Sequence, residues 1–461
     1  MTARSARGAV ATALVLALVT SAGACSRSDG GGAAAVGGRK DSVVVGIAHE
    51  PETLSPLLGY GKDGNSKIFD GLLTRDAQMK LQPALATALP RVSADRLTYT
   101  FTLRRGVKFS DGEPFGAKDV VFTYRTILDK GTNNPSKTEL DAVERVEARG
   151  EGEVVFTLKY PYAPFAERTV LPIAPEHIAA RQNVNSGDFS TRPVGTGPYL
   201  LSTWSKGEKL GFTANPHYWR GEPAVRKFTM AVIKDDDVRA TRLRSGELDG
   251  AVLPPNLASG FRGHGRVTYA AKSFDYRTVT LPTHNKVTGD IAVRKALDVA
   301  VDRQAMVDSI LEGAGKPAYG PVPTDSPWFT PGTERTRDLD AAKRILDAAG
   351  WQPGKDGVRE RDGLRASFPL WYPSGDELRQ DHALAYASDA KKVGIEIRTE
   401  AGAWEAIEPR MRTDAVLAGG GSPADPDFDQ YQLLTTTTSS NASSRRTPGT
   451  PSSLISTIST S

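Results

Sequence analysis

The length of the chain limits its fold more than any other feature of the sequence. One hydrophobic core stops growing at roughly 250–300 residues, so a chain of 461 residues needs at least two cores. Hydrophobic residues make up 39% of the chain, and 58 Lys+Arg against 54 Asp+Glu give a formal charge of +4. This balance excludes a disordered chain and a strongly cationic nucleic-acid binder. We therefore expect a folded protein of several lobes.

The first 25 residues have the layout of a bacterial export signal. Arg4 and Arg7 precede an apolar run of 12 residues from Gly8 to Val19, which is too short to span a bilayer that needs about 20. Small residues then lead to Cys25, the only cysteine of the chain. The site resembles the lipobox of bacterial lipoproteins, although Ala22 stands where leucine is usual.

This layout predicts a signal peptide over residues 1–24 and a lipid joined to Cys25 through a thioether. The small and polar residues of 25–40 show no apolar period, which is typical of a flexible tether. An ordinary cleaved signal that leaves a free cysteine is the alternative. Either way, we expect an exported protein.

Regular patterns begin at Ser42. A β-branched run predicts a strand over 42–48, and two prolines in the following segment 50–57 argue against both a helix and a central strand. Tyr99, Phe101 and Leu103 alternate as in a strand. The turn signal 110–112 follows, and then a helical pattern over 117–128.

Two later segments read as helices that pack on a core. In residues 290–311 the apolar positions recur near helical spacing, which predicts one continuous core-packing helix; these positions are Ile291, Val293, Leu297, Val301, Met306, Ile310 and Leu311. A further helix begins near residue 341, where Asp340 is the expected N-cap and Gly350 the expected left-handed stop.

No motif in the sequence indicates a catalytic or metal-binding site. The six histidines, at positions 49, 177, 217, 264, 284 and 382, show no zinc-site spacing, and no GxSxG elbow is present. Asp425, Asp427 and Asp429 lack the glycine and distal glutamate of an EF-hand, so cap and loop roles are favoured over calcium. The sequence predicts no enzyme activity, no cofactor and no metal site, although a carboxylate pair formed in space stays open.

Ordered blocks along the chain resemble the family 5 extracellular solute-binding proteins, the dipeptide, oligopeptide and nickel receptors of ABC importers. The blocks follow the family's order and spacing from about Ser42 to about Leu434; they are EPETLSPL, LTYTFTLRRGVKFSDGEPFGAKDVVF, RPVGTGPYLLSTWSKGE, NPHYWRGEPAV, RSGELDGAV, DIAVRKALDVAVDRQAMVDSILEGAGKPAYGPVP and DLDAAKRILDAAGW.

The resemblance implies an α/β, periplasmic-binding-protein-like two-lobe fold of type II, in the large variant with an extra subdomain. Lobe I would comprise residues 41–67 and 193–275, the subdomain 68–192 and lobe II 276–434. It further implies a monomeric substrate-binding lipoprotein at the outer face of the cell membrane, which delivers a peptide or peptide-like solute to ABC permease subunits. A secreted hydrolase on a similar shell and a non-transporting surface sensor are the alternatives.

The resemblance also assigns candidate ligand residues. Trp404 matches a tryptophan that lines the pocket of peptide-binding members, with core packing as the alternative. Arg379 falls where some members have an arginine for a ligand carboxylate, with a solvated helix arginine as the alternative. Trp371 and Tyr372 are further pocket candidates that could equally belong to the core.

Peptide-binding members usually place a tryptophan and then an acidic residue before the DPD sequence. Aligned on that sequence, Gly419 takes the tryptophan position and Ser422 takes the acidic position that pairs with a peptide ammonium group. A serine cannot balance a buried ammonium, and glycine for indole is expected to open the pocket wall. We hypothesise a solute that is bulkier or less cationic than a free peptide; with a one-residue slip, Asp425 would be the ammonium partner.

The last residues depart from the family. Residues 435–461 hold eight Thr and nine Ser in 27 positions and show no core-forming period. We expect this segment to be a disordered tail or the product of a frameshifted or early-ended reading frame. Missing family strands would then leave apolar surface uncovered.

Overall fold

The computed structural model describes residues 41–263, 265–270, 275–320, 322–324, 326–421, 425–427 and 456–459. The chain divides into two units, 1–38 and 39–461, and every described residue belongs to the second. The predicted signal peptide, Cys25 and the tether over 25–40 therefore lie outside the described residues. Among the described residues, no helix is both long enough and apolar enough to cross a membrane.

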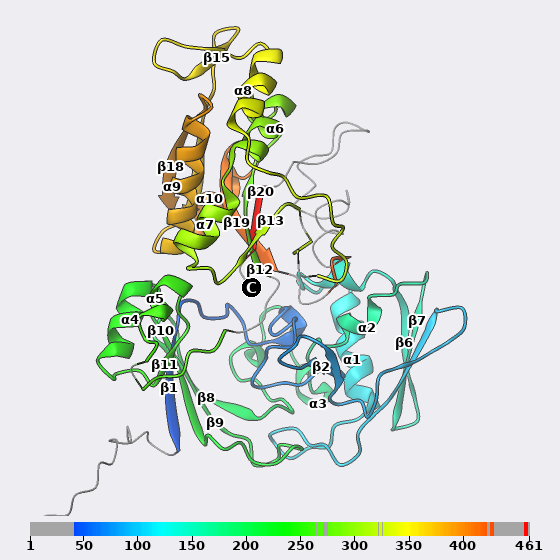
Figure 1. Ribbon diagram of the computed structural model, residues 1–461. Coiled ribbons are helices and arrows are strands. Elements are labelled where there is room, and N and C mark those ends of the chain that lie inside the picture. Colours follow the sequence, from blue (N-terminus) through cyan, green and yellow to red (C-terminus); the bar gives the residue numbers. More distant parts are fainter. Residues whose placement is uncertain are drawn as a thin grey trace, which may run out of the picture. The chain divides into compact units, whose positions relative to one another are not determined.

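The strand predicted at residues 42–48 is confirmed as β1 and lies inside a five-stranded sheet (Figure 1). The sheet order is β11-β1-β10-β9-β8, and β1 runs parallel to both of its neighbours. Helices α4 and α5 pack beside β1 and β11. The bounds are β1 Ser42–Ile47, β8 Tyr199–Ser205, β9 Lys209–Ala214, β10 Lys227–Val232, β11 Gly250–Ala251, α4 Asp236–Arg244 and α5 Pro255–Ser259.

A second, four-stranded antiparallel sheet has the order β4-β5-β7-β6. The prediction for this region is confirmed: α1 spans 117–128, and Tyr99, Phe101 and Leu103 are buried. The bounds are β4 Arg91–Val92, β5 Thr98–Thr102, β6 Val143–Arg149, β7 Glu153–Leu158, α1 Ala117–Leu128, α2 Phe165–Arg168 and α3 Glu176–Ala179, with a β-hairpin of β2 Leu73–Arg75 and β3 Leu81–Pro83.

The two prolines of segment 50–57 were expected to prevent a helix, but a short helix begins at the second of them. A 3₁₀ helix, η1, covers Pro56–Leu58 and ends at Gly59, which has a φ of 98°. Proline is tolerated here because the first position of a helix needs no backbone donor. The remaining 3₁₀ helices are η2 Lys137–Leu140, η3 Asp188–Ser190 and η4 Glu408–Arg410.

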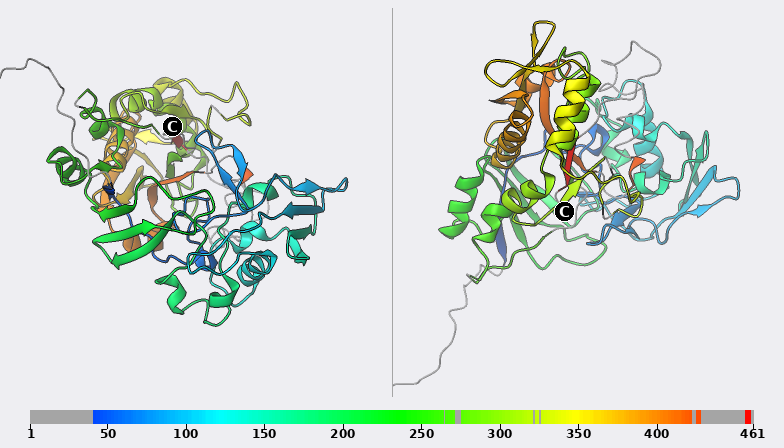
Figure 2. Two further views of the ribbon diagram at one scale, coloured as in Figure 1. Left: turned by 90° about the horizontal axis from the view of Figure 1, so that it is seen from below. Right: turned by 45° about the horizontal axis from the view of Figure 1, so that its top comes forward.

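A third sheet of six strands has the order β13-β20-β12-β19-β17-β18. β12 pairs with β19 antiparallel, whereas β17 pairs with β18 and β19 parallel. Helix α9 lies along β17 and β18, as the orange segments of Figure 2 show. The bounds are β12 Asp275–Thr280, β13 Lys316–Ala318, β17 Ser367–Pro373, β18 Glu396–Gly402, β19 Ala415–Gly421, β20 Ser456–Ser459, α9 Glu377–Lys391 and α10 Trp404–Ile407.

The helix predicted over 290–311 is two helices, and the prediction of one is wrong. α6 spans Ile291–Ala300 and α7 spans Arg303–Ile310. Val301 is extended with a ψ of 129°, and the Asp302 side chain accepts a hydrogen bond from the Ala305 N–H at 3.0 Å, so α7 starts with its own cap. Ile291 was also expected in the core, but as the first residue of α6 it is 48% exposed.

The expected N-cap of the next helix is also wrong by two residues. α8 spans Leu339–Ala348, and the side chain of Asp338 accepts a hydrogen bond from the Ala341 N–H at 2.7 Å. Asp340 lies inside the first turn instead. Gly350 has a φ of 82°, which confirms the predicted left-handed stop. A small sheet follows, formed by β14 Gln352–Pro353, β15 Arg359–Arg361 and β16 Leu364–Arg365.

Two large cores and one small one hold these elements. The first core joins the four-stranded sheet and α1 to β9, and its centre includes Phe101, Tyr124 and Phe156. The second joins α6, α7, α8 and α9 to the six-stranded sheet around Trp351 and Phe368. The expectation of at least two cores is confirmed.

Four residues of the expected tail form a strand. β20, Ser456–Ser459, pairs antiparallel with β12 and with β13. A disordered segment was expected here, so these four residues depart from that expectation. The rest of 435–461 lies outside the described residues.

Candidate functional site

Arg379 and Gly419, two of the candidate ligand residues, lie next to each other. Gly419 is on β19, directly opposite Arg277 of β12 in the antiparallel register. A Cβ added to Gly419 would lie 3.0 Å from Arg277 Nη1 and 3.1 Å from Arg379 Nη2. Two guanidinium groups therefore converge on this glycine.

The first turn of α9 positions Arg379. Asp376 is the N-cap of the helix, and its carboxylate accepts a hydrogen bond from the Arg379 N–H at 2.9 Å. The same carboxylate forms an ion pair with the Arg379 guanidinium, whose side chain is 20% exposed. Arg379 Nε is buried without a hydrogen-bond partner. The alternative of a solvated helix arginine is therefore wrong.

Arg277 is a site residue that sequence reasoning missed. Its Nη1 donates to the carbonyl of Tyr276 at 3.1 Å, and its Nε is buried without a partner. Burial lowers the pKa of Arg277, and the positive charge of Arg379 lowers it further. Within the described part of the chain, Arg277 enters no ion pair, in contrast to Arg379.

A small cavity adjoins Arg277 between β12, β19 and α9. Its wall consists of the side chains of Arg277, Arg303, His382, Tyr386, Val279, Val301 and Leu417. His382 is fully buried, and its Nδ1 lies 2.6 Å from the carbonyl oxygen of Leu378. A carbonyl only accepts, so Nδ1 carries the proton. His382 Nε2 is buried without a partner, and burial lowers the pKa of the ring.

The expectation that Gly419 opens the wall is wrong at this position. An added Cβ would lie 2.8 Å from the carbonyl oxygen of Tyr276, besides its close approach to the two arginines. Side chains of a neighbouring strand and of α9 already occupy the room beside the glycine. At the position where peptide-binding members have a tryptophan, this chain has a glycine. The space beside it is filled by the guanidinium groups of Arg277 and Arg379 and is not empty.

Trp371 lies on the other face of the six-stranded sheet. Its strand neighbours Leu370 and Tyr372 are buried in the core that α9 covers, so the side chain between them points away from α9. Trp371 Nε1 donates to the Asp414 carboxylate at 3.0 Å, and the Arg410 guanidinium lies 4.8 Å from the indole centroid. For Tyr372, the core alternative is confirmed.

Trp404 is the first residue of α10 and is 44% exposed. The alternative that it packs in the core is therefore wrong. α10 itself is held down by Ile407, which is fully buried, and the helix contacts β17. An exposed indole on a fixed short helix has a face available for contact with a solute.

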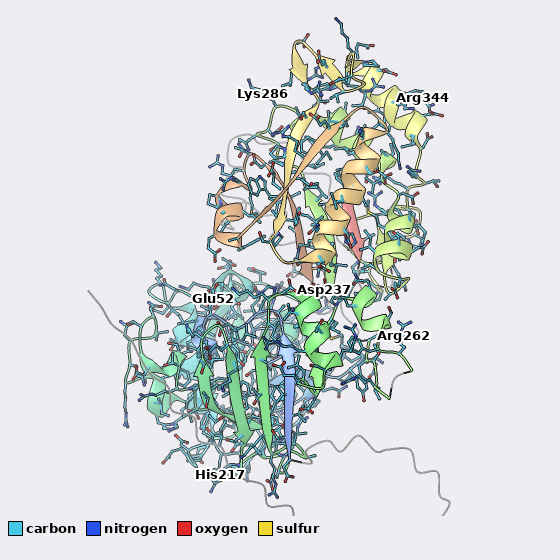
Figure 3. The ribbon with its side chains drawn as sticks, turned by 90° about the vertical axis from the view of Figure 1, so that its left-hand side faces the viewer. Glu52, His217, Asp237, Arg262, Lys286 and Arg344 are labelled. Carbon is cyan, nitrogen blue, oxygen red and sulfur yellow. The ribbon has the colours of Figure 1, made fainter. Side chains whose placement is uncertain are left out.

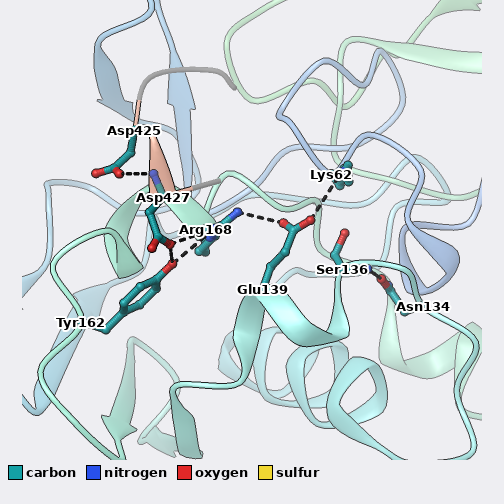
Figure 4. Close-up of polar contacts among 8 residues, drawn as sticks. All are labelled: Lys62, Asn134, Ser136, Glu139, Tyr162, Arg168, Asp425 and Asp427. Carbon is teal, nitrogen blue, oxygen red and sulfur yellow. Dashed lines mark hydrogen bonds and ion pairs between the residues drawn. The ribbon is translucent and has the colours of Figure 1, made fainter. Parts of the chain in front are cut away.

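Figure 4 shows the segment that follows β19. Asp425 accepts a hydrogen bond from the Asp427 N–H at 2.9 Å, in the loop role expected for this cluster. Asp427 in turn binds the hydroxyl of Tyr162 and lies 3.4 Å from Arg168 Nη2. Ser422 and Asp429 lie outside the described residues, so the choice between Ser422 and Asp425 as an ammonium partner stays a prediction.

Arg168 links this segment to the core of the four-stranded sheet region. Its Nη1 lies 2.9 Å from Glu139, which also pairs with Lys62 at 3.1 Å. Arg168 is only 4% exposed. A buried arginine shared by two carboxylates fixes Asp427 in place, because removing either partner leaves a buried charge less well balanced.

The first turns of α4 and α9 also meet. Burial and a hydrogen bond with Asp237 raise the pKa of Glu377 to about 7, and Asp236 and Asp235 act in the same direction. Asp237, labelled in Figure 3, is in the first turn of α4. The carboxylates at the start of α4 thus hold the pKa of a carboxyl group of α9 above its ordinary value.

Within the described ranges, no group of three or more His, Cys, Asp or Glu side chains could hold a metal ion. At Gly419 the guanidinium groups of Arg277 and Arg379 come together, and the Asp376 carboxylate pairs with Arg379.

The family described as bacterial extracellular solute-binding proteins, family 5, matches residues 80–443. Protein XP55 of Streptomyces lividans is 66% identical over 431 residues, which cover 92% of this chain and 78% of XP55. The oligopeptide-binding protein AppA of Bacillus subtilis is 29% identical over 453 residues, covering 91% of this chain and 81% of AppA.

Two solved structures show the same fold. The crystal structure of NikZ from Campylobacter jejuni in complex with Ni(L-His) has a TM-score of 0.81 at 28% identity and covers 88% of this chain and 82% of that one. The structure of AppA from Bacillus subtilis with a nonapeptide has a TM-score of 0.76 at 27% identity, covering 86% and 82%.

Proposed function

The chain belongs to family 5 of the bacterial extracellular solute-binding proteins, and on this basis we propose that it captures a peptide or peptide-like solute between two lobes and delivers it to an ABC permease. It has the two-lobe α/β fold of type II that its structural neighbours share. The observation that supports the proposal best is the structural similarity to NikZ and AppA over more than four fifths of the chain. Both of those structures contain a bound ligand.

The division into lobes is part of the proposal. Lobe I comprises 41–67 and 193–275, the subdomain 68–192 and lobe II 276–434. The five-stranded, four-stranded and six-stranded sheets support it, because each takes nearly all of its strands from one of these regions. A solute held between lobes is removed from water by a hinge motion, so each polar group of the solute needs a placed partner.

The cellular setting is also proposed from the sequence. A signal peptide over 1–24 exports the chain, and a lipid on Cys25 holds it at the outer face of the cell membrane, as a monomer. The tether over 25–40 leaves the lobes free to reach the permease. Mass measurement of the membrane-extracted protein tests this: a diacylglyceryl adduct on Cys25 is expected, and a chain with a free thiol would contradict it.

Native mass spectrometry of the protein as purified tests solute capture. We expect a carried-over small molecule that leaves on mild heating, and small-angle X-ray scattering that changes when a saturating solute is added. Scattering that is identical with and without solute, together with no carried-over molecule, would contradict the proposal. Chemical conversion of the solute would favour the hydrolase alternative instead.

Trp404 supplies a sharper test. The substitution Trp404→Ala is expected to weaken binding of the carried-over solute about tenfold, because an aromatic anchor that becomes desolvated contributes 1 kcal/mol or more. Trp328 is 60% exposed and provides a matched tryptophan for the control Trp328→Ala. Titration calorimetry of both variants measures the effect, and equal affinities would remove Trp404 from the site.

A panel of free dipeptides and tripeptides tests the expected loss of the ammonium partner. With Ser422 in place of a carboxylate, we expect weak binding of peptides that carry a free N-terminus, since an unbalanced buried ammonium costs several kcal/mol. N-acetylated versions of the same peptides should bind better. Tight binding of the free peptides would show that the hypothesis is wrong.

A further inference from the structure

We infer that the slot between β12 and β13 is a binding surface for one extended strand, and that residues 456–459 of the same chain fill it. This inference goes beyond the proposed function, because it holds whichever solute the protein captures. In Figure 1, β20 is the red strand that lies with β12 and β13. Three observations on the six-stranded sheet support it.

The first observation is that β20 has a partner strand on each side. It runs antiparallel to both β12 and β13. Thr457, for example, lies opposite Thr278 of β12 and opposite Ala318 of β13. The backbone N–H and C=O groups of an interior strand point alternately to its two neighbours, so both rows of groups on β20 find partners. Residues 456–459 therefore form an interior strand of the sheet.

The second observation is that β13 belongs to the sheet only through β20. Among the described strands, β13 pairs with β20 alone. Its middle residue, Pro317, lies opposite Ile458 and has no N–H to donate, which confines such a strand to the edge of a sheet. Neighbouring strands lie roughly 4.8 Å apart, so an empty slot would separate β12 from β13 by roughly 10 Å. Backbone hydrogen bonds do not cross that distance.

The third observation is the burial of β12. Tyr276 and Thr278 are 8% and 5% exposed, and Val279 is 3% exposed. Successive side chains of a strand point to opposite faces, so β12 is buried on both faces, as is typical of a strand inside a sheet. With the slot empty, β12 would present a row of unpaired backbone groups to any other chain. A strand from the same chain removes this hazard.

The composition of residues 456–459 fits such a slot. The sequence STIS has no charged residue, no proline and no glycine, and Thr and Ile favour strands. A strand that is added to a sheet is held mainly by its main-chain hydrogen bonds. A segment rich in Ser and Thr can therefore complete the sheet although it shows no apolar period.

A pair of cysteines gives the first test. In a Cys25→Ser chain, which has no other cysteine, Thr278→Cys with Thr457→Cys places two thiols directly opposite each other. Opposite residues lie about 4.5–5.5 Å apart and fit a disulfide, whereas diagonal residues lie about 7–8 Å apart and do not. Thr278→Cys with Ser459→Cys is therefore the matched control.

On mild oxidation we expect the opposite pair to close within one chain and the diagonal pair to stay reduced, as read by mass spectrometry of the digested protein. Closure of both pairs to the same extent, or of neither, would overturn the inference. A disulfide between two chains in the opposite pair would overturn the assignment to the same chain and would give the slot to a second copy.

Hydrogen exchange of β12 gives the second test. Thr457→Pro removes one backbone donor from an interior strand, whereas Thr457→Val keeps the donor and a β-branched side chain. We expect the β12 amides that point to β20 to exchange about tenfold faster or more in Thr457→Pro and at the wild-type rate in Thr457→Val. Unchanged exchange in Thr457→Pro would overturn the inference.

A synthetic peptide of residues 452–461 completes the test. It should restore slow exchange of β12 in Thr457→Pro, and the same peptide with proline at position 457 should not. In wild type the slot is already filled, so titration calorimetry should detect no binding of the peptide. Binding to wild type as tight as to Thr457→Pro would show that the chain's own strand does not occupy the slot.

Discussion

Asp70 is a buried acid whose environment disfavours its charge. Its Oδ2 accepts hydrogen bonds from Trp219 Nε1 at 2.9 Å and from the Thr196 hydroxyl at 3.2 Å. Burial nevertheless raises its pKa to about 6, against the lowering effect of these two donors. Arg104 and Arg220 lie on the Trp219 ring, at 4.4 and 4.5 Å from its centroid, and hold the indole in place.

This pKa makes stability depend on pH. Because the folded chain holds the Asp70 proton more tightly than the unfolded chain, the stabilisation is complete below the ordinary carboxyl pKa and is lost as pH rises to about 6. Asp70→Asn should remove a fall in unfolding free energy on the order of 2–3 kcal/mol between pH 4 and pH 7. Urea unfolding at several pH values measures this.

Asp76 is the matched control for that experiment. It is half-buried, and the backbone N–H of Lys80 leads the interactions that lower its pKa. Its contribution to stability is therefore present at neutral pH and lost on acidification, so Asp76→Asn should show the opposite pH trend. The same trend in both variants would contradict the role assigned to Asp70.

At the scale of single elements, the two corrected caps show what decides where a helix begins. Val301 continues the apolar spacing of α6, yet Asp302 starts α7, and Asp338 rather than Asp340 starts α8. Apolar spacing indicates which side of a helix faces the core, but it does not reveal a break of two residues such as Val301 and Asp302. A cap depends on the extended backbone of one residue, which the sequence does not display.

The caps of α8 provide a direct test. Asp338→Ala should cost about 1 kcal/mol of unfolding free energy, because the N–H of Ala341 loses its acceptor. Asp340→Ala removes an exposed carboxylate from the first turn and should cost only a few tenths of that amount. Equal losses in denaturant titrations would restore Asp340 as a cap.

The sequence predicted part of the candidate site. Arg379 and Gly419 follow from the family resemblance, since both occupy positions defined by sequence motifs. Arg277 could not be found in this way, because its role depends on the register that places β12 against β19. One local signal was available: in DYRTVT an arginine stands two residues before the buried Val279, so a charge lies on the core-facing side of a strand.

At the scale of the whole molecule, the raised pKa of Glu377 couples α9 of the six-stranded sheet region to Asp237 of α4 beside the five-stranded sheet. The pKa of Glu377 is about 7, and burial is the largest cause. The protonated carboxyl group donates to Asp237 below this value, and above it two like charges face each other. The contact is therefore present in mild acid and lost as pH rises through 7.

Glu377→Gln should keep this contact at every pH, because an amide N–H donates without titrating. Hydrogen exchange of the α9 first-turn amides, corrected for intrinsic rates, should slow in wild type from pH 8 to pH 6 and should stay constant in the variant. Glu377→Ala should exchange fast at both values. A pH-independent wild type would show that no proton is shared.

The pairing of Gly419 with Arg277 also constrains how these two positions can change during evolution. A bulky residue at 419 and a long cation at 277 compete for the same space, because a Cβ on Gly419 would lie 3.0 Å from Arg277 Nη1 on the adjacent strand. A side chain at 419 would require the Arg277 guanidinium to move aside, whereas a shorter residue at 277 would relieve that close contact. Across lineages the two codons should consequently change together, and a homologue that regains the indole is expected to carry a short, uncharged residue on the partner strand.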